Sequence, residues 1–543
     1  MVLRRITQSI SLVVFVVLLW YAAFPLVLPV PVDLFLRMDP IVLITTLTAT
    51  RALVPSLLLA VVIVGLTIIF GRFFCSMVCP MGTTIDVVDT FLPRSYEAER
   101  KYPLSSSTFK RIKYLVLSFL IGAALFGVSF AYLAAPIPLA TRLYGLLVYP
   151  VFTLAADVIL NLVRPLAEHI GADTLAYATL ENPIFALQWF TVALLAAIFT
   201  SCLLTPRFWC RYLCPAGAIF AIASIHPCLK RRVSDECTSC GLCRQQCPMD
   251  AIADDPRATE SSECIVCQTC VKVCPVDAVR FSFAGQAFMQ RTTPFSAHRR
   301  ALILSGLSGI GTALITLTSL KGMARESGSG QIIDPSLIRP PGAVPELEFL
   351  GRCVGCGECM KVCPTNTLQP AGLSSGIGGL LSPVVIPRRG PCEPTCNACG
   401  QVCPTRAIRE ISLEEKRYAK IGTAYIMRHK CIAWEFERPC LVCDEVCPFG
   451  AVELKRIEGV SIAVPFVDES RCNGCGFCEF FCPVQATSAI VIEPMDVLRL
   501  EKGSYREKSR ELGLSIEPKQ QQSFEHGQPS EAPQRFLPPG FTE

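Results

Sequence analysis

Runs of cysteines that end in Cys-Pro recur along this chain, and they constrain its fold more than any other feature. The chain has 30 cysteines in 543 residues. A disulfide framework in a secreted domain does not require a repeated spacing of this kind. Six runs share the same plan, in which three cysteines are followed by a fourth that directly precedes proline. This plan predicts tight loops that present several thiolates to one metal centre.

The first two runs follow the spacing C-x2-C-x2-C-x3-C-P, which is typical of bacterial [4Fe-4S] ferredoxins. In that pattern three thiolates of a run bind one cluster, and the cysteine before proline binds the other cluster. The predicted ligand sets are Cys237, Cys240, Cys243 and Cys274, and Cys264, Cys267, Cys270 and Cys247. Zinc is disfavoured, because a zinc ribbon rarely carries four cysteines in one repeated run that ends in proline.

Four more runs follow residue 350, two with the regular spacing and two, which lie between them, with a longer first gap. Their nested order suggests that the outer runs pair with each other and that the inner runs do the same. The predicted sets are Cys353, Cys356, Cys359 and Cys482; Cys472, Cys475, Cys478 and Cys363; Cys392, Cys396, Cys399 and Cys447; and Cys431, Cys440, Cys443 and Cys403. We therefore expect six [4Fe-4S] clusters as cofactors.

Six cysteines remain: Cys202, Cys228 and two C-x3-C-P pairs, Cys75 with Cys79 and Cys210 with Cys214. Residues four apart share one face of a helix. The four paired thiols therefore have three interpretations, as ligands of an additional centre, as structural residues or as redox-active thiols. A reducing cytoplasm argues against stable disulfides.

The composition is that of an integral membrane protein, since 51% of the residues are hydrophobic and only 17% are charged. A spanning helix needs about 20 mostly apolar residues. The segments that meet this requirement are 6–30, 53–70, 114–135 and 184–204. The basic loops 91–113 and 206–232 should both be cytoplasmic, which requires an even number of spans between them. We therefore place the apolar segment 143–163, which contains Pro150 and Asp157, at the outer interface.

A fifth span, within 296–322, begins after Arg299 and Arg300 and would carry everything after about Lys321 out of the cytoplasm. Its start is similar to a twin-arginine export signal. It also fits an ordinary anchor with positive flanks, and both interpretations export the C-terminal half. The third interpretation is an apolar core helix in a wholly cytoplasmic domain. The N-terminus is expected in the cytoplasm of a multi-pass protein of the inner (cytoplasmic) membrane, and the last ferredoxin domain in the periplasm.

The expected fold class is a membrane α-helical bundle joined to α+β bacterial-ferredoxin-like domains, one double-cluster unit and one four-cluster tandem. The predicted parts are a membrane domain (1–225), a cytoplasmic ferredoxin (226–290), the fifth span (296–321), a linker (322–346), an exported ferredoxin domain (347–500) and a disordered tail (501–543).

Several other chemistries have no visible basis in the sequence. It contains no C-x2-C-H haem attachment run, no G-x-G-x-x-G after a strand and no Walker-type phosphate loop. The sequence contains no basic stripe interleaved with aromatic residues, so nucleic acid is not expected as a partner. Iron–sulfur clusters serve one-electron chemistry, so the chain is expected to conduct electrons.

Several motifs resemble a known pair of families. "GRFFCSMVCPMG" and "FWCRYLCPAGA", followed by a double ferredoxin, resemble NapH, a membrane quinol dehydrogenase subunit. "IRPPGAVPELEFLGRCVGCGECMKVCP" and "CIAWEFERPCLVCDEVCP" resemble NapG, its exported four-cluster partner. MauN and MauM of methylamine utilisation share these patterns. Here both parts lie in one chain, which raises their effective concentration for each other.

The resemblance implies a quinol dehydrogenase that takes electrons from the quinone pool and passes them to an exported cytochrome or reductase. The alternative is an accessory donor for the maturation or activation of an exported redox enzyme. Polar residues near the spans are candidates for the quinol site, because such groups are costly in a membrane. These candidates are Asp33, Asp39, Arg51, Arg142 and His169, and each has a structural anchor as its alternative role.

Overall fold

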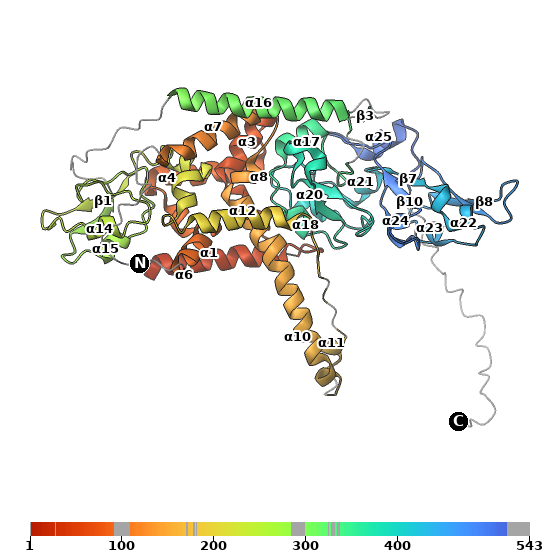
Figure 1. Cartoon of the computed structure of the whole chain (residues 1–543), viewed down its shortest axis with the longest axis horizontal. Helices are drawn as coiled ribbons and strands as arrows, with labels where there is room; N and C mark the ends of the chain where they lie inside the picture. Colours follow the sequence, from red (N-terminus) through yellow and green to blue (C-terminus); the bar gives the residue numbers. More distant parts are fainter. Residues whose placement is uncertain are drawn as a thin grey trace.

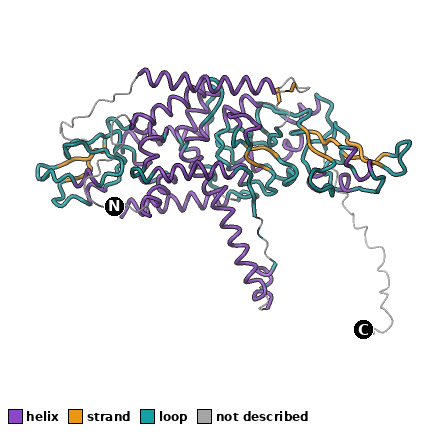
Figure 2. Tube along the Cα trace, in the orientation of Figure 1, coloured by secondary structure: helices purple, strands orange, loops and turns teal. Residues whose placement is uncertain are grey.

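The computed structural model describes residues 2–27, 29–91, 109–169, 172–177, 180, 182–283, 299–323, 325–326, 332–333 and 337–517. A helical body separates two cysteine-rich parts, with the first part (229–283) at one end and the second (337–517) at the other (Figure 1). Apart from the short pair β3 (Arg325–Glu326) and β4 (Ile332–Ile333), the strands lie in these two end parts (Figure 2).

Within the described residues, five apolar helices connect the two ends: α1 (Val2–Tyr21), α4 (Leu58–Phe70), α7 (Ile112–Leu125), α12 (Gln188–Ser201) and α16 (Arg299–Met323). Their contacts give their directions. Lys113, in the first turn of α7, pairs with Glu263 of the first part, whereas Ser129, just after α7, donates to Leu350 O of the second at 3.0 Å. Helix α4 runs the opposite way, since Ser56 donates to Pro404 O at 2.9 Å and Gly71 lies against Val266.

The same alternation holds for the other three helices. After α1, the Lys361 ammonium group of the second part donates to Trp20 O and Ala22 O, both at 2.8 Å. Just before α12, the Ala186 N–H donates to Gln369 Oε1 of the second part at 2.8 Å. Helix α16 packs along the length of the shorter helix α7 (Figure 1). Thus α1, α7 and α16 run from the first part to the second, and α4 and α12 run back.

The other helices of the body lie between these five or project from them. They are α2 (Leu34–Arg37), α3 (Pro40–Thr50), η1 (Pro55–Leu57), α5 (Phe73–Met77), α6 (Pro80–Phe91), η2 (Phe109–Arg111), α8 (Ala131–Ala134), α9 (Pro136–Arg142), η3 (Leu143–Val148), α10 (Tyr149–His169), α11 (Asp173–Ala176), η4 (Trp209–Leu213) and α13 (Pro215–Ala223).

Three described helical stretches are long and apolar enough to cross a membrane: Arg4–Tyr21, Pro136–His169 and Arg300–Thr318. The helix predicted for 114–135 is corrected, because α7 ends at Leu125 and the chain turns at Gly127, which has φ +81°. Helix α10, which contains the second half of the segment 143–163, extends away from the body instead of connecting its ends (Figure 1).

Helices α7 and α16 pack closely because both present small residues. Ser118 donates to Leu302 O at 2.8 Å, and Ser305 donates to Leu115 O at 2.7 Å. A Cβ added to Gly309 would lie 2.2 Å from Phe119 O, so only glycine fits at this crossing. Small residues of this kind let helix backbones approach each other closely within a membrane.

The two end parts contain three units with one shared strand plan. An outer antiparallel pair closes the unit, and an inner antiparallel contact joins the two cysteine runs. In the first unit the outer contact joins β1 (Leu229–Val233) to β2 (Val279–Phe283), and the inner contact joins Ile252 to Thr259. In the second unit the outer contact joins Ala343 to Ile408, and the inner contact joins β5 (Leu368–Pro370) to β6 (Pro383–Val385). In the third unit the outer contact joins β7 (Thr423–Ile426) to β10 (Ile490–Glu493), and the inner contact joins β8 (Val452–Lys455) to β9 (Val464–Val467).

Short helices carry the cysteine runs and connect the units. They are α14 (Leu242–Gln245), α15 (Thr269–Lys272), α17 (Glu346–Arg352), α18 (Glu358–Lys361), η5 (Leu373–Ser375), α19 (Gly376–Gly379), α20 (Ala398–Gln401), α21 (Leu413–Tyr418), η6 (Arg428–Lys430), α22 (Ile432–Glu435), α23 (Val442–Glu445), α24 (Phe477–Phe481) and α25 (Tyr505–Glu511).

Two predicted boundaries are corrected by buried residues. The end of the predicted linker is folded, since Arg339 and Glu346 form a buried ion pair at 2.6 Å. The start of the predicted disordered tail is also folded: Tyr505 of α25 is fully buried, and its N–H donates to Glu415 at 2.6 Å. The first stretch is rich in proline and the second is polar in sequence, but distant partners hold both in place: Arg499 pairs with Glu346 at 2.6 Å, and Glu415 caps the start of α25. The rest of the tail (518–543), most of 324–336 and the basic loop 92–108 lie outside the described residues.

Candidate metal centres

Cavities lined by four cysteines are the main chemical feature of the two end parts. In the first unit one cavity is lined by Cys247, Cys264, Cys267 and Cys270, which is the set predicted from the spacing. Cys243 and Cys274, from the other predicted set, lie in one apolar cluster, and Cys243 interacts electrostatically with Cys237 and Cys240.

The second part brings together different sets from the nested ones predicted, and this corrects the predicted pairing. Its three cavities are lined by Cys353, Cys356, Cys359 and Cys403; by Cys431, Cys440, Cys443 and Cys482; and by Cys472, Cys475, Cys478 and Cys447. Cys392 and Cys399 interact electrostatically with Cys363, which leaves Cys363 as the partner of the run Cys392, Cys396 and Cys399.

The physical reason is the strand plan. Each outer strand contact closes a unit around two consecutive runs, so the cysteine before proline reaches the other run of its own unit. The third unit begins only at β7, after the second unit has closed at Ile408. The second part thus contains two units in series, each with the strand plan of the first unit.

The cysteine sets fit iron–sulfur clusters. The backbone N–H of Ala251 donates to Cys247 Sγ at 3.4 Å, and that of Ala451 donates to Cys447 Sγ at 3.3 Å. Burial raises the pKa of Cys443 to about 12, so a free thiol there would be protonated at neutral pH. Metal coordination deprotonates a thiol, and iron would supply the compensating charge in these apolar cavities. Among the described residues no group of His, Cys, Asp or Glu is placed to hold a single metal ion.

Basic side chains lie directly beside some of these thiols. Burial alone would lower the pKa of Lys416, but the thiolates of Cys392 and Cys399 outweigh it and the pKa is raised. Nothing in the sequence distinguishes Arg231 from the other basic residues of the loop 206–232. It is buried and donates to Cys243 Sγ at 3.4 Å and to Thr259 Oγ1 at 2.9 Å.

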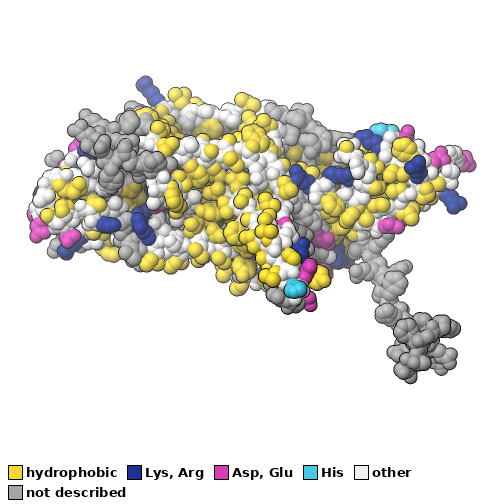
Figure 3. All heavy atoms as spheres, turned by 60° about the horizontal axis from the view of Figure 1, so that its bottom comes forward, with side chains coloured by type: hydrophobic (Ala, Val, Ile, Leu, Met, Phe, Trp, Pro, Cys, Tyr) yellow, Lys and Arg dark blue, Asp and Glu magenta, His cyan; other side chains and the backbone are white. Residues whose placement is uncertain are grey.

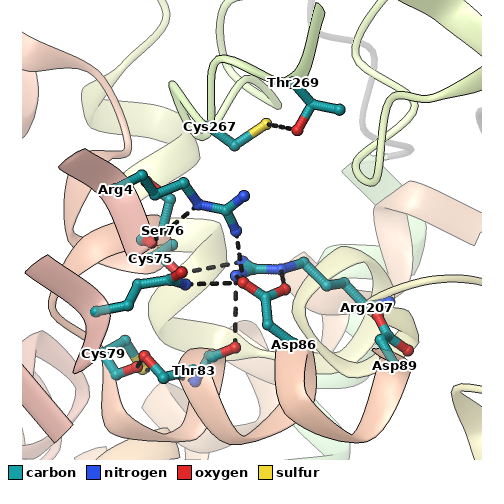
Figure 4. Close-up of polar contacts among 12 residues, drawn as sticks. Arg4, Cys75, Ser76, Cys79, Thr83, Asp86, Asp89, Arg207, Cys267 and Thr269 are labelled. Atoms are coloured by element: carbon teal, nitrogen blue, oxygen red, sulfur yellow. Dashed lines mark hydrogen bonds and ion pairs between the residues drawn. The ribbon is translucent and has the colours of Figure 1, made fainter. Parts of the chain in front are cut away.

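The two C-x3-C-P pairs meet at the end of the helical body that faces the first ferredoxin unit. Cys75 lies in α5 and Cys210 in η4, while Cys79 and Cys214 directly precede α6 and α13. Cys75 and Cys210 pack against the same apolar cluster as Cys264 and Cys267. Figure 4 shows Cys75 and Cys79 beside the buried ion pairs of this region, with Cys267 across from them.

The five candidates for the quinol site do not come together. Asp39 is buried, caps α3 by accepting from Ile41 N at 2.9 Å, and also accepts from Ile137 N at 3.3 Å. Asp33 pairs with Arg37 at 2.8 Å. The described positions of Arg51, at the exposed end of α3, and His169, at the end of α10, are both on the surface.

Arg142 differs from the other four, since it is fully buried and lines a cavity between the helical body and the second part. The other lining residues are Leu146, Leu147, Ala186, Gln188, Thr191, Gly355, Gly357, Pro370 and Leu381. Arg142 donates to Tyr132 O, whereas its Nε and Nη1 have no hydrogen-bond partner among the described residues. It also interacts electrostatically with Cys356, one of the predicted cluster ligands.

Known sequence families match several parts of the chain. A 4Fe-4S binding domain matches residues 53–97 and again 187–232, and each match contains one C-x3-C-P pair. A 4Fe-4S dicluster domain matches 229–283, which is the first unit. Another 4Fe-4S binding domain matches 350–369 and 465–487, in the second part.

Curated relatives cover about a third of the chain. The methylamine utilization ferredoxin-type protein MauM of Methylorubrum extorquens is 32% identical over 212 residues, which are 38% of this chain and 92% of the relative. The ferredoxin-type protein NapG of Escherichia coli is 32% identical over 37% of this chain and 84% of its own length. The ferredoxin-type protein NapF of the same organism is 31% identical over 31% of this chain and 90% of its own length.

These relatives match over most of their own length, and the cysteine cavities supply ligands for several [4Fe-4S] clusters. The chain therefore belongs to the MauM/NapG family of ferredoxin-type iron–sulfur electron-transfer proteins, with a ferredoxin of this type joined to other parts in one polypeptide.

Proposed function

We propose that this protein is a membrane-bound electron-transfer protein that oxidises quinol and passes the electrons to an exported acceptor such as a multihaem cytochrome or a reductase. It carries six [4Fe-4S] clusters, two in the first part and four in the second. The N-terminus and the first part lie in the cytoplasm, the helical body crosses the membrane as a NapH-like domain, and the second part lies outside.

The surface of the helical body supports this placement. Its visible face is largely apolar, while charged side chains gather over the two ends (Figure 3). Basic residues near the first part include Arg4, Lys110 and Lys113. An excess of such residues marks the cytoplasmic side of a membrane protein.

Helix α10 supports a membrane surface at the other end. It starts beside the second part, where Tyr149 lies under the Lys361 ammonium group at 4.4 Å. One side of α10 exposes large apolar side chains, such as Phe152, Ile159 and Leu162, while Asp157 and Asn161 lie on a polar stripe. A helix of this kind lies in the interface plane instead of crossing the bilayer.

The observation that carries the quinol assignment is the Arg142 cavity. It lies between η3 and α12 of the helical body and the loop that contains Gly355, Cys356 and Gly357. That loop approaches closely because Gly357, at φ +84°, has no side chain: a Cβ there would lie 2.9 Å from Leu146 Cδ1. The cavity has room for about one water-sized group, so a quinol bound at its mouth would place one oxygen there, beside a cluster ligand and the unpaired guanidinium donors of Arg142.

The chemistry is the two-electron oxidation of quinol to quinone with release of two protons. Iron–sulfur clusters accept these electrons one at a time. Arg142 holds the quinol oxygen and favours its deprotonated form, because a cation stabilises the developing negative charge. The protons leave to water on the side of the second part. This arrangement needs no electron carrier across the membrane.

Replacement of Arg142 tests this function. In the purified, cluster-loaded protein, Arg142→Gln should slow cluster reduction by a short-chain ubiquinol or menaquinol about tenfold or more, since charged hydrogen bonds contribute ~1.5–3 kcal/mol. Reduction by dithionite should be unchanged. Arg51→Gln is the matched control, because Arg51 lies on the surface of the same body. An unchanged quinol rate in the Arg142 variant would remove this cavity as the quinol site.

A second candidate function is that of an accessory electron donor for the maturation of an exported enzyme. The similarity to MauM, a protein named for methylamine utilization, favours it. Rapid, sustained quinol turnover supports the first function, whereas a requirement only during assembly of a partner enzyme supports the second.

A further inference from the structure

The helical body contains an internal repeat that ends in the two C-x3-C-P pairs. Helix α4 is followed by "GRFFCSMVCPMG", and α12 is followed by a turn and "PRFWCRYLCPAG". Each copy has an arginine three residues before its first cysteine, Arg72 in one and Arg207 in the other. Each copy also has a glycine three residues after its second cysteine, Gly82 and Gly217.

The four thiols of the repeat lie together. Cys79 interacts electrostatically with Cys75 and Cys210, and Cys214 interacts with the other three. The second thiol of each pair accepts a hydrogen bond at the start of the next helix: Gly82 N donates to Cys79 Sγ at 3.4 Å, and Gly217 N to Cys214 Sγ at 3.3 Å. The two copies thus present equivalent thiols to one place.

The two arginines cross between the copies. Arg207 of the second copy donates to Cys75 O at 3.1 Å and to Gly82 O at 3.4 Å in the first copy. Arg72 of the first copy lies against Gly217 of the second, with Nη2 3.0 Å from the position of a Cβ there. Both arginines are fully buried. The result is a nearly two-fold arrangement of four thiols and two guanidinium groups.

These guanidinium groups carry more positive charge than their carboxylate partners balance. Glu263 is shared by Arg72, at 2.9 Å, and Lys113, at 2.5 Å. In the same way Asp86 is shared by Arg207 and Arg4, both at 2.5 Å (Figure 4).

The first group has two cations for one carboxylate and so has one positive charge in excess, whereas the second group has Asp89 as a second carboxylate. Asp89 contacts the second group through the backbone N–H of Arg207, at 3.1 Å. Buried charge without a counterion is costly. The Nε and Nη2 atoms of Arg72 have no hydrogen-bond partner among the described residues, although Arg72 interacts electrostatically with Cys75 and Cys214. Thiolate anions beside Arg72 would supply the missing counterion.

We infer that Cys75, Cys79, Cys210 and Cys214 bind one additional [4Fe-4S] cluster, shared between the two copies of the repeat and balanced by Arg72 and Arg207. Four thiolates around an oxidised cube carry two net negative charges, which would offset the excess positive charge beside Arg72 and provide acceptors near its unpaired Nε and Nη2 atoms. The 4Fe-4S binding domain that matches each copy covers only one C-x3-C-P pair, so one cube needs both copies. Cys75 and Cys210 share an apolar cluster with Cys264 and Cys267, which places the new centre beside the first ferredoxin unit.

Iron content tests this inference without reference to quinol. The full-length protein, purified without oxygen, should hold about 28 iron and 28 acid-labile sulfide atoms, four per cube in seven cubes. The double variant Cys79→Ser/Cys214→Ser should lose about four of each. Serine is itself a good helix N-cap, so the start of α6 and of α13 remains capped while the thiolate is lost. Cys202→Ser, which changes a buried thiol near Cys210, and Cys228→Ser are the controls and should lose none.

Three results would overturn the inference. They are about 24 irons in the unmodified protein, as expected for six cubes, one zinc ion per chain in place of the missing iron, and unchanged iron in the double serine variant. The count in the unmodified protein stands even if the variant fails to fold. Quinol oxidation is tested separately through Arg142, so either proposal can fail alone.

Discussion

At the scale of single residues, the cysteine before proline decides which thiols act together, since it leaves its own run to complete the set of another run. Cys403 lines a cavity with Cys353, Cys356 and Cys359, and Cys482 lines one with Cys431, Cys440 and Cys443. Both runs end in Cys-Pro, and nothing in their spacing distinguishes consecutive from nested partners.

The pairing predicts which thiols become reactive when one ligand is lost. In Cys482→Ser the set of Cys431, Cys440 and Cys443 loses its fourth ligand, so these three thiols should be alkylated in the native protein and be identified by peptide mass mapping. Cys403→Ser should expose Cys353, Cys356 and Cys359 in the same assay. If Cys482→Ser instead exposes Cys353, Cys356 and Cys359, the nested pairing is correct and the consecutive one fails.

At the scale of elements, the helix that divides the two sets of cysteine runs is held by its small residues. Helix α16 packs along α7 through Gly306, Gly309 and Ser305, and its exposed side carries Ile303, Leu304 and Leu307. Because the residues at the crossing are small, the backbones of α7 and α16 lie closer together than a Cβ atom at Gly309 would allow. This packing determines where the second part emerges from the helical body.

Two glycines of α16 provide a matched test of this packing. Gly309→Leu places a side chain against Phe119 O and should destabilise the protein by about 1–3 kcal/mol, seen as a lower midpoint of thermal unfolding in detergent. Gly311→Leu should leave the midpoint within error, because a Cβ at Gly311 meets nothing within 4 Å. Equal effects of the two variants would show that α16 does not depend on α7.

At the scale of the whole molecule, the two ferredoxin parts lie at opposite ends of a body whose five connecting helices, within the described residues, alternate in direction (Figure 1). An odd number of crossings places the ends of a chain on opposite sides of a membrane. In the proposed topology, the first ferredoxin unit therefore serves one compartment and the two units of the second part serve the other.

A tag at each end of the chain tests this arrangement. In intact cells whose outer barrier has been made permeable, an impermeant protease should remove a C-terminal tag and leave an N-terminal tag untouched. A protein expressed with both tags supplies the control within one sample, and lysis should make both tags accessible. Protection of both tags before lysis would place all the clusters in the cytoplasm and exclude an exported acceptor.

The sequence by itself determined the ligand residues and the class of protein. Cysteine spacing is local, so each run identifies its own loop, and an apolar stretch such as 6–30 identifies a helix, although α1 ends at Tyr21 and not at residue 30. The predicted ends of the elements were less accurate for two reasons. The chain turns at a single glycine, Gly127, after α7. Distant contacts also fold a polar segment, since Tyr505 N donates to Glu415.

Only the tertiary structure decided how these local pieces combine. Strand closure selected consecutive runs over nested ones, because hydrogen bonds between β7 and β10 join residues that are far apart in the sequence. Arg207 and Arg231 belong to the loop 206–232, which the sequence predicts as a basic loop beside the membrane, yet both are buried beside thiols, as is Arg72. Burial and partnership are properties of the folded chain, since they depend on which distant carboxylates and sulfurs it brings to each guanidinium group.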